Sequence, residues 1–312
     1  MSSTKDEFSL TKLTEKLFES IIQSSNDAIV CKTLDGIVRS WNPAAETIFG
    51  YTASEMIGQS MLKIFPEDQI SEEEDIISRL SHGEVINSYQ TIRKHKSGKL
   101  LNVSVTISPV FDDEGNVIAA SNIARDISEQ TQAQEILWKQ ANYDALTGLA
   151  NRDLLMKSLT HEIEMVQQSN NRDSLAILFL DLDHFKEYND THGHDFGDEL
   201  LKHAADILSK TCRNADLIAR YAGDEFIILL SGDFPKKELK RFLDRLVSKL
   251  NVPYTINGID CRLSASIGLA MYPDDAESID DLMKKADEAM YNAKSSGRNQ
   301  YKFFNEPSGF TQ

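Results

Sequence analysis

The spacing of hydrophobic and polar positions changes several times along the chain. Residues 6–20 place apolar side chains near helical spacing and predict a short amphipathic helix. Residues 28–124 consist of short alternating segments separated by turn signals, which predict strands. A helical and mostly polar stretch follows from 126 to 143. Helical and strand patterns then alternate from 144 to 304, which indicates a second folded region.

The first folded region has the pattern of a small antiparallel sheet. Strands are expected at 28–31, 37–41, 88–95, 100–110 and 117–124. A helix that opens on a proline and stops at a glycine is expected at 42–50. We therefore predict an α+β domain over residues 16–127, with helices on one side of its sheet.

The second folded region predicts an α/β or α+β domain, with a central sheet surrounded by helices. Helices are expected at 151–168, 196–212, 235–250 and 279–293. Strands are expected at 174–180, 218–221, 225–230, 263–271 and 300–304. The helix at 235–250 shows the cleanest 3.6-residue period.

Composition narrows the class of protein. The length of 312 residues favours two domains, and 41% hydrophobic residues suffice for two cores. No apolar run approaches the roughly 20 residues of a membrane helix, and the start lacks the apolar stretch of a signal peptide. With three widely spaced cysteines, these features predict a cytoplasmic protein. The net charge of −16 argues against nucleic acid and membrane as partners, so cations must mediate any contact with a nucleotide phosphate.

Two acidic turns are candidates for a functional site. A buried strand runs directly into Asp181-Leu-Asp183, and the turn Ala222-Gly-Asp-Glu225 puts two more carboxylates between strands. Loop carboxylates that converge suit Mg²⁺, which is usually held by one or two carboxylates plus substrate phosphates. Composition alone leaves the alternative that these are ordinary solvated turns.

The first region resembles a PAS sensor domain. The resemblance rests on Asn26-Asp-Ala-Ile29, Asp35-Gly36, Trp41-Asn-Pro-Ala-Ala-Glu-Thr-Ile-Phe-Gly-Tyr51, Lys96-Ser-Gly98 and Arg125-Asp-Ile127. The ligand is left open. A haem would need a histidine in the helix before residue 88, where Ser71–Ser78 has none, and His82 is expected in a loop. No cysteine stands where a light-sensing flavin adduct is expected. Trp41 and Asn42 face either a small ligand or the core.

The second region resembles the GGDEF domain of diguanylate cyclases. Four motifs occur in order: Asp144-Ala-Leu-Thr-Gly-Leu-Ala-Asn-Arg152, the segment from Asp181 to Asp198, Ala222-Gly-Asp-Glu-Phe226, and Lys294-Ser-Ser-Gly-Arg-Asn299. The stretch between the two domains resembles a signalling helix that pairs as a coiled coil, although a solvated linker helix fits equally. The expected organisation is an N-terminal helix at 1–15, PAS at 16–127, a linker at 128–143, GGDEF at 144–305 and a tail at 306–312.

The GGDEF resemblance implies an activity and a role for each matching residue. The family condenses two GTP into cyclic di-GMP and two pyrophosphates, so two domains must face each other, here as a homodimer through PAS and the linker helix. The resemblance implies that Asp181 and Asp224, with the carbonyl of Leu182, bind Mg²⁺ or Mn²⁺. The remaining implied residues are Asp224, Glu225 and Lys186 for catalysis, Asn189, His194, Asp198, Phe185, Lys294 and Arg298 for substrate binding, and Arg213 and Asp216 for inhibition by the product.

One residue departs from the family pattern. Ala222 replaces the first glycine of the signature turn, and a residue with a Cβ is strained where φ is positive. We therefore expect an active cyclase, with the rate set by Ala222. The alternative is an inactive domain that serves as a receptor for GTP or cyclic di-GMP. Asp198 disfavours mixed nucleotides, because a carboxylate there pairs with the N–H donors of guanine.

Overall fold

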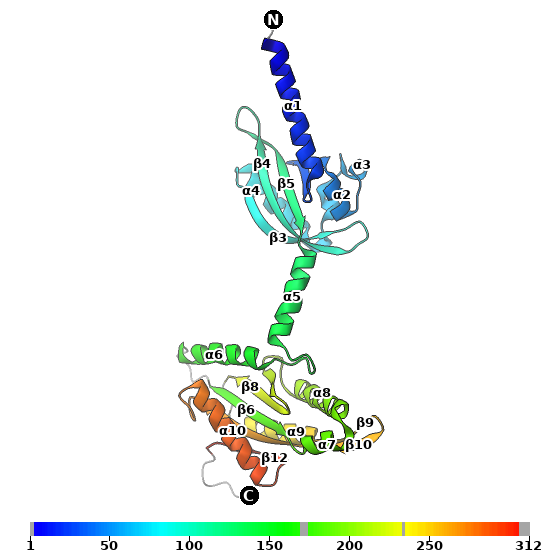
Figure 1. Ribbon diagram of the computed structural model, residues 1–312. Helices are drawn as coiled ribbons and strands as arrows, with labels where there is room; N and C mark the ends of the chain where they lie inside the picture. Colours follow the sequence, from blue (N-terminus) through cyan, green and yellow to red (C-terminus); the bar gives the residue numbers. More distant parts are fainter. Residues whose placement is uncertain (1–2, 169–173, 233–234, 306–312) are drawn as a thin grey trace. The chain divides into compact units, whose positions relative to one another are not determined.

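A computed structural model of the chain describes residues 3–168, 174–232 and 235–305. The chain divides into two compact units, Met1–Ile136 and Leu137–Gln312 (Figure 1). No helix within the described ranges is long and apolar enough to cross a membrane. The expected tail at 306–312 lies outside the described residues.

The first unit is built on one antiparallel sheet of five strands in the order β2-β1-β5-β4-β3. The strands are β1 (Ala28–Thr33), β2 (Val38–Trp41), β3 (Ile86–Lys94), β4 (Leu100–Phe111) and β5 (Val117–Asp126). The helical segments are α1 (Ser3–Ser24), α2 (Pro43–Phe49), α3 (Ala53–Met56), α4 (Ile70–Ser81), and the 3₁₀ turns η1 (Met61–Ile64) and η2 (Glu67–Gln69). The predicted antiparallel sheet and the helix after Asn42 are confirmed.

Trp41 and Asn42 are structural residues at the start of α2. Asn42 Oδ1 accepts hydrogen bonds from the backbone N–H groups of Ala45 and Ile29, and its Nδ2 donates to two further carbonyls. Trp41 is 6% exposed and donates its indole N–H to the carbonyl of Tyr51. Their polar atoms are therefore used within the fold, which favours the core interpretation of these two residues.

The N-terminal helix has an end that differs from the expected one, whereas the linker helix does not. Helix α1 runs to Ser24, so the boundary expected at residue 15 falls inside the helix and is wrong. The apolar spacing continues through Leu17 and Ile21, and no glycine or proline interrupts it. Helix α5 (Ser128–Asn142) occupies the expected linker.

The second unit has a central sheet of five strands in the order β12-β11-β6-β8-β7 (Figure 1). Only the β11–β12 pair is parallel. The strands are β6 (Leu175–Leu182), β7 (Leu217–Ala222), β8 (Glu225–Ser231), β11 (Ala265–Tyr272) and β12 (Gln300–Phe303). The helices are α6 (Arg152–Gln168), α7 (Phe185–His192), α8 (His194–Thr211), α9 (Lys236–Leu250) and α10 (Ile279–Ser295).

Both faces of the central sheet are covered by helices, so β6 is buried on both sides. Ala176, Leu178 and Leu180 belong to the core that holds the apolar residues of α8 and α9. Leu175 and Ile177 belong to the opposite core, with apolar residues of α6 and α10. Burial on both faces explains the unbroken apolar run that predicted this strand.

Sequence reasoning missed a hairpin and a short helix in the second unit. Strands β9 (Pro253–Ile256) and β10 (Ile259–Arg262) pair antiparallel around Asn257-Gly258. Both turn residues have positive φ, at 50° and 82°. An Asn-Gly pair between short apolar segments is a strong hairpin signal that was available in the sequence. Sequence reasoning also missed helix α7, because its residues lie within the motif from Asp181 to Asp198, which was interpreted by its function.

Gly268 sets the distance between β11 and α10. A Cβ at this position would lie 2.0 Å from the carbonyl oxygen of Ala286 and 2.1 Å from the amide nitrogen of Met290. Because both are backbone atoms, the helix would have to move. We expect Gly268→Ala to lower the free energy of unfolding of the second unit by about 3 kcal/mol or more, as measured by urea denaturation of the full chain.

Gly258→Ala is the control for that substitution. Unlike Gly268, Gly258 has positive φ, at 82°, and no atom lies within 4 Å of its added Cβ. We expect this variant to lose only the backbone cost of about 1–2 kcal/mol. Equal losses in the two variants would contradict the steric explanation.

Candidate functional site

The acidic residues of the two predicted turns meet on one face of the central sheet. Asp181 in β6 lies directly opposite Glu225 in β8. Alternation along the strands places both side chains on the face that carries Phe179 and Ile227, the face covered by α10. Like charges directly opposite each other across two strands are destabilising. The sheet register therefore concentrates negative charge at this point.

Lys294, near the end of α10, supplies a positive charge to this cluster. Its Nζ lies 2.7 Å from Asp181 Oδ2. Burial raises the pKa of Asp181, the bond from Lys294 opposes this rise, and Asp224 adds to it. Burial also raises the pKa of Glu225, and the charges of Asp181 and Asp224 raise it further. The ammonium group of Lys294 therefore does not neutralise the combined negative charge of Asp181, Asp224 and Glu225.

The turn between β7 and β8 brings Asp224 to the end of β6. The backbone N–H of Leu182 donates to the carbonyl of Asp224 at 3.2 Å. Gly223 has a φ of 51°, whereas Ala222 is not among the residues with positive φ. Ala222 is also exposed. The strain that this alanine would cause in a left-handed position is therefore avoided, because Gly223 alone takes that conformation.

Arg220 fixes the same turn and was not identified from the sequence as a site residue. Its Nε donates to the carbonyl of Gly223 at 2.9 Å, and its Nη1 lies 3.2 Å from both carboxylate oxygens of Asp144. The pKa of Asp144 is lowered. Burial raises it, but hydrogen bonds from Thr147 and Arg220 together lower it by more. The first and third sequence motifs are thus joined by one arginine.

Asp183 is the second residue that sequence reasoning left without a role. It is 3% exposed and accepts hydrogen bonds from the hydroxyls of Ser264 and Ser266 and from the backbone N–H of Asn299. Arg298 and Asn299 have positive φ values of 61° and 45°, which are costly for residues other than glycine. Asp183 therefore holds the strained fourth motif beside β6.

Asn189 and Gly197 define the predicted base-binding region between α7 and α8. Asn189 Oδ1 is buried and has no hydrogen-bond partner among the described residues. A Cβ on Gly197 would lie only 1.8 Å from this oxygen, so glycine permits the two helices to approach. An orphaned buried acceptor costs free energy and indicates a missing donor.

The remaining predicted substrate residues, together with the predicted catalytic residue Lys186, lie on the same two helices or on the fourth motif. His194, Asp198 and Lys186 are exposed, as is Arg298. Phe185 is half-buried and packs against the apolar core, so it anchors α7. The structure thus gives Phe185 a packing contact, while the other four side chains are available to a ligand.

Arg213 and Asp216 lie away from the acidic cluster, in the turn after α8. The backbone N–H of Arg213 donates to Asp216 Oδ2 at 2.7 Å, which closes the turn. A groove beside it is also lined by Arg241 and Arg245 of α9. These two arginines were missed by the sequence analysis, because nothing in the chain order links α9 to this turn.

The acidic cluster fits a hard cation bound together with a ligand. Within the described ranges, no three His, Cys, Asp or Glu side chains are grouped so as to enclose a metal alone. Asp181 and Asp224 offer carboxylate oxygens, and their charges raise the pKa values of their neighbours. Mg²⁺ commonly takes one or two carboxylates and completes its shell with phosphate and water oxygens. The donor set therefore suits Mg²⁺ with a phosphate ligand.

Glu225→Gln is expected to stabilise the ligand-free second unit by raising its melting temperature a few degrees. The folded state raises the pKa of Glu225, so ionising it at neutral pH costs folding free energy. A neutral glutamine avoids that cost. The exposed Glu277→Gln serves as the control and should leave the melting temperature unchanged. A lower melting temperature for Glu225→Gln would contradict the electrostatic account.

Comparisons with known proteins identify relatives of this chain. The cyclic di-GMP phosphodiesterase PdeR of Escherichia coli K12 is 31% identical, over 92% of this chain and 43% of the relative. The probable diguanylate cyclase DgcE of the same organism is 31% identical, over 92% of this chain and 26% of the relative. The chain thus spans less than half the length of either relative.

A solved structure and two family models cover the separate units. The GGDEF domain of TpbB, also called YfiN, from Pseudomonas aeruginosa aligns with a TM-score of 0.50 and 34% identity, over 52% of this chain and 94% of that one. The PAS domain model matches residues 26–129. The model described as "Diguanylate cyclase, GGDEF domain" matches residues 141–300, about half of the chain. The chain therefore belongs to the GGDEF family, with a PAS domain preceding its GGDEF domain.

Proposed function

We propose that the protein is a diguanylate cyclase that condenses two GTP molecules into cyclic di-GMP and two pyrophosphates under the control of its PAS domain. The observation that carries this proposal is the cluster of Asp181, Asp224 and Glu225, which holds more negative charge than Lys294 neutralises. Such a cluster suits cation-bound triphosphate. The family membership and the relatives named for cyclic di-GMP chemistry support the same reaction class.

GTP is bound by residues from three parts of the domain. Asn189 Oδ1 accepts an N–H of guanine and so gains the donor that it lacks. Asp198 accepts a second N–H, which selects guanine over adenine. Lys294 and Arg298 bind the outer phosphate oxygens. On binding, Lys294 would exchange Asp181 for phosphate. Asp181, Asp224 and the Leu182 carbonyl would hold Mg²⁺ or Mn²⁺, which would neutralise charge on the phosphates.

Each condensation joins two GTP molecules held by two facing domains. The 3′-oxygen of one GTP attacks the α-phosphorus of the other, its proton passes to Asp224 or Glu225, and pyrophosphate leaves. The raised pKa of Glu225 suits a proton acceptor. Lys186 stabilises charge on the reacting phosphate. A second step of the same kind, in which the attacking and attacked molecules exchange roles, releases the second pyrophosphate and closes the ring. Positioning of the two reactants supplies most of the rate acceleration.

A homodimer brings two such domains together. Helix α1 exposes Leu13, Leu17 and Ile21 at a spacing of four residues, each more than half exposed. Leu137 and Trp138 of α5 are also more than half exposed. Apolar stripes on helices that flank the PAS domain favour pairing between two copies.

The product is proposed to inhibit the enzyme at Arg213 and Asp216. Arg241 and Arg245 line the same groove and add two guanidinium groups. Guanidinium groups bind phosphate and the guanine edge through paired hydrogen bonds. The groove therefore has the charge and the donors that an anionic cyclic dinucleotide requires, even though the whole chain is acidic.

The alternative function is an inactive receptor for GTP or cyclic di-GMP. It rests on Ala222, the only departure noted in the signature turn. The structure weakens it, because Ala222 avoids positive φ and Asp181, Asp224, Glu225 and Lys294 are all present at the site. A receptor has no need to maintain a costly cluster of carboxylates.

We expect the purified chain to release pyrophosphate from GTP and Mg²⁺, with a specific activity that rises with protein concentration as dimers form. Asp224→Asn should lower kcat by about 100-fold or more, because a metal ligand is lost. Ala222→Gly should change kcat by less than about threefold, since the turn already has its left-handed glycine. Absence of turnover in both the wild type and Ala222→Gly would favour the receptor.

Arg213→Ala is expected to raise the cyclic di-GMP concentration needed for half-inhibition at least tenfold, because a charged hydrogen bond is lost. Uninhibited turnover should stay the same, since Arg213 lies outside the acidic cluster. Lys210→Ala removes a nearby cation that pairs with Asp206 and provides the matched control. Unchanged inhibition in Arg213→Ala would exclude the groove as the inhibitory site.

A further inference from the structure

Two acidic residues are buried within the described ranges, and their surroundings differ. Glu73 in α4 is 5% exposed, and Asp183, directly after β6, is 3% exposed. Glu73 belongs to the PAS domain and Asp183 to the GGDEF domain. A buried carboxylate is costly unless a cation matches its charge or its oxygens accept hydrogen bonds. The kind of partner that each residue has therefore indicates what the residue does.

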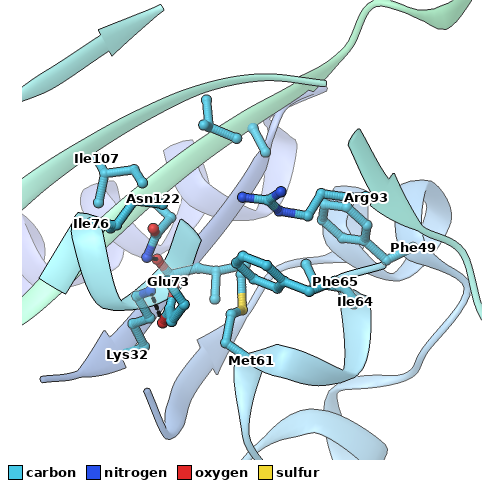
Figure 2. A pocket seen from close by; sticks show the side chains of 13 residues that line it. Lys32, Phe49, Met61, Ile64, Phe65, Glu73, Ile76, Arg93, Ile107 and Asn122 are labelled. Atoms are coloured by element: carbon cyan, nitrogen blue, oxygen red, sulfur yellow. Dashed lines mark hydrogen bonds and ion pairs between the residues drawn. The ribbon is translucent and has the colours of Figure 1, made fainter. Parts of the chain in front are cut away.

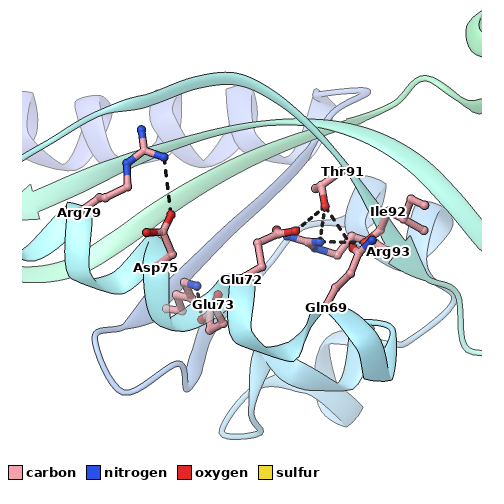
Figure 3. Close-up of polar contacts among 9 residues, drawn as sticks. Gln69, Glu72, Glu73, Asp75, Arg79, Thr91, Ile92 and Arg93 are labelled. Carbon is pink, nitrogen blue, oxygen red and sulfur yellow. Dashed lines mark hydrogen bonds and ion pairs between the residues drawn. The ribbon is translucent and has the colours of Figure 1, made fainter.

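In the PAS domain, cations neutralise the buried carboxylate and its neighbour. Lys32 of β1 is 1% exposed, and its ammonium group donates to Glu73 Oε1 (Figure 2). Arg93 of β3 donates to Glu72 Oε1 at 2.5 Å (Figure 3). These two ion pairs join α4 to two different strands of the sheet. A structural role therefore accounts for both glutamates.

In the GGDEF domain, Asp183 is held by neutral donors. Its Oδ1 accepts the hydroxyl of Ser266 at 2.7 Å. Its Oδ2 accepts the hydroxyl of Ser264 at 2.7 Å and the backbone N–H of Asn299 at 2.9 Å. Ser264 precedes β11 and Ser266 lies in it, whereas Asn299 lies in the turn between α10 and β12. One carboxylate thus joins β6, β11 and this turn, and its charge strengthens each bond.

The turn that Asp183 contacts has an unfavourable backbone conformation. Arg298 and Asn299 have positive φ, at 61° and 45°. Both carry a Cβ and are strained there, arginine more than asparagine. The turn's other hydrogen bonds within the described ranges run to Ala293 and Lys294, at the end of the same helix α10. The bond from Asn299 to Asp183 is therefore the described contact that fixes the turn against β6.

The conformation of this turn determines where the guanidinium of Arg298 lies. Arg298 is exposed and directly precedes Asn299. A guanidinium binds phosphate oxygens through paired N–H groups, and such pairing needs a defined direction of approach. Lys294 lies within α10 and already reaches Asp181, so its position does not depend on the turn. Loss of the Asp183 contact would therefore redirect Arg298 and leave Lys294 in place.

We propose that Asp183 is a positioning residue that gives the site its preference for a triphosphate over a diphosphate. Asp183 fixes the turn at Asn299, the turn directs Arg298, and Arg298 binds the outermost phosphate. This role rests on the proposed function, since it takes GTP as the ligand. It explains why a charged side chain is buried at this point, because a carboxylate holds a strained N–H about twice as strongly as a neutral acceptor does.

Calorimetric titration of the full chain with two matched analogues and Mg²⁺ tests this role. The analogues are GTP and GDP in which a methylene group replaces the oxygen between the α- and β-phosphorus atoms, so neither can react. We expect the wild type to bind the triphosphate about tenfold more tightly than the diphosphate, or more. Asp183→Ala should reduce this ratio of affinities to about threefold or less by weakening the triphosphate alone. A role in folding only would weaken both analogues by the same factor.

Three further variants separate positioning from stability. Asp183→Asn keeps an oxygen that can accept from Asn299, so its ratio should lie between those of the wild type and Asp183→Ala. Ser266→Ala removes a donor to the other carboxylate oxygen, so it should lower the melting temperature and keep the wild-type ratio. In an Arg298→Ala background, Asp183→Ala should not change the ratio further, because Asp183 acts through that arginine.

The outcomes distinguish this role from the proposed function itself. An unchanged ratio in Asp183→Ala, or an equal fall in Ser266→Ala, would overturn the positioning role. If Asp183→Ala does not fold, a wild-type ratio in Asp183→Asn would overturn it. Equal binding of both analogues by the wild type would also overturn this role alone. Failure of the wild type to bind either analogue would reject the proposed function together with it.

Discussion

The electrostatic repulsion between Asp181 and Glu225 is the constraint on which the proposed function depends. The register of β6 against β8 puts these carboxylates opposite each other, and the turn adds Asp224 beside them. Burial strengthens the repulsion, because the low dielectric of the sheet's covered face screens it less. Lys294 relieves part of it. Without a ligand, charge repulsion at this cluster therefore lowers the folding stability of the domain, as is common for sites that bind cations and phosphates.

Two residues outside the predicted set keep this costly arrangement in place. Arg220 joins the turn carbonyl of Gly223 to Asp144, so the turn cannot withdraw from the site. Asp183 accepts three hydrogen bonds and fixes the strained backbone at Arg298 and Asn299. Arg220 donates its hydrogen bonds and Asp183 accepts them, and the partners of both lie within the same domain. Stable, satisfied polar contacts therefore surround a cluster that is left unsatisfied, which is a preorganised arrangement for binding charge.

The sequence predicted the strands of the two five-stranded sheets, most helices and the acidic cluster, because apolar spacing and motif order are local features. It did not predict Asp183 or Arg245, because their roles arise from neighbours far away in the chain. Lys32 is an instructive miss. It follows Ala28 and Val30 at alternate positions of β1, so strand alternation alone places it on the core side. The burial of Lys32 was therefore visible in the sequence, whereas its partner Glu73, on a helix, was not.

The most direct test of the central claim is the melting temperature of the full chain with Mg²⁺ and a GTP analogue that cannot react. If the carboxylate cluster is short of positive charge, Mg²⁺ and the analogue together should stabilise the GGDEF domain by more than the sum of their separate effects. Asp181→Asn should abolish that excess. Equal stabilisation by the analogue with and without Mg²⁺, in both the wild type and Asp181→Asn, would contradict the account.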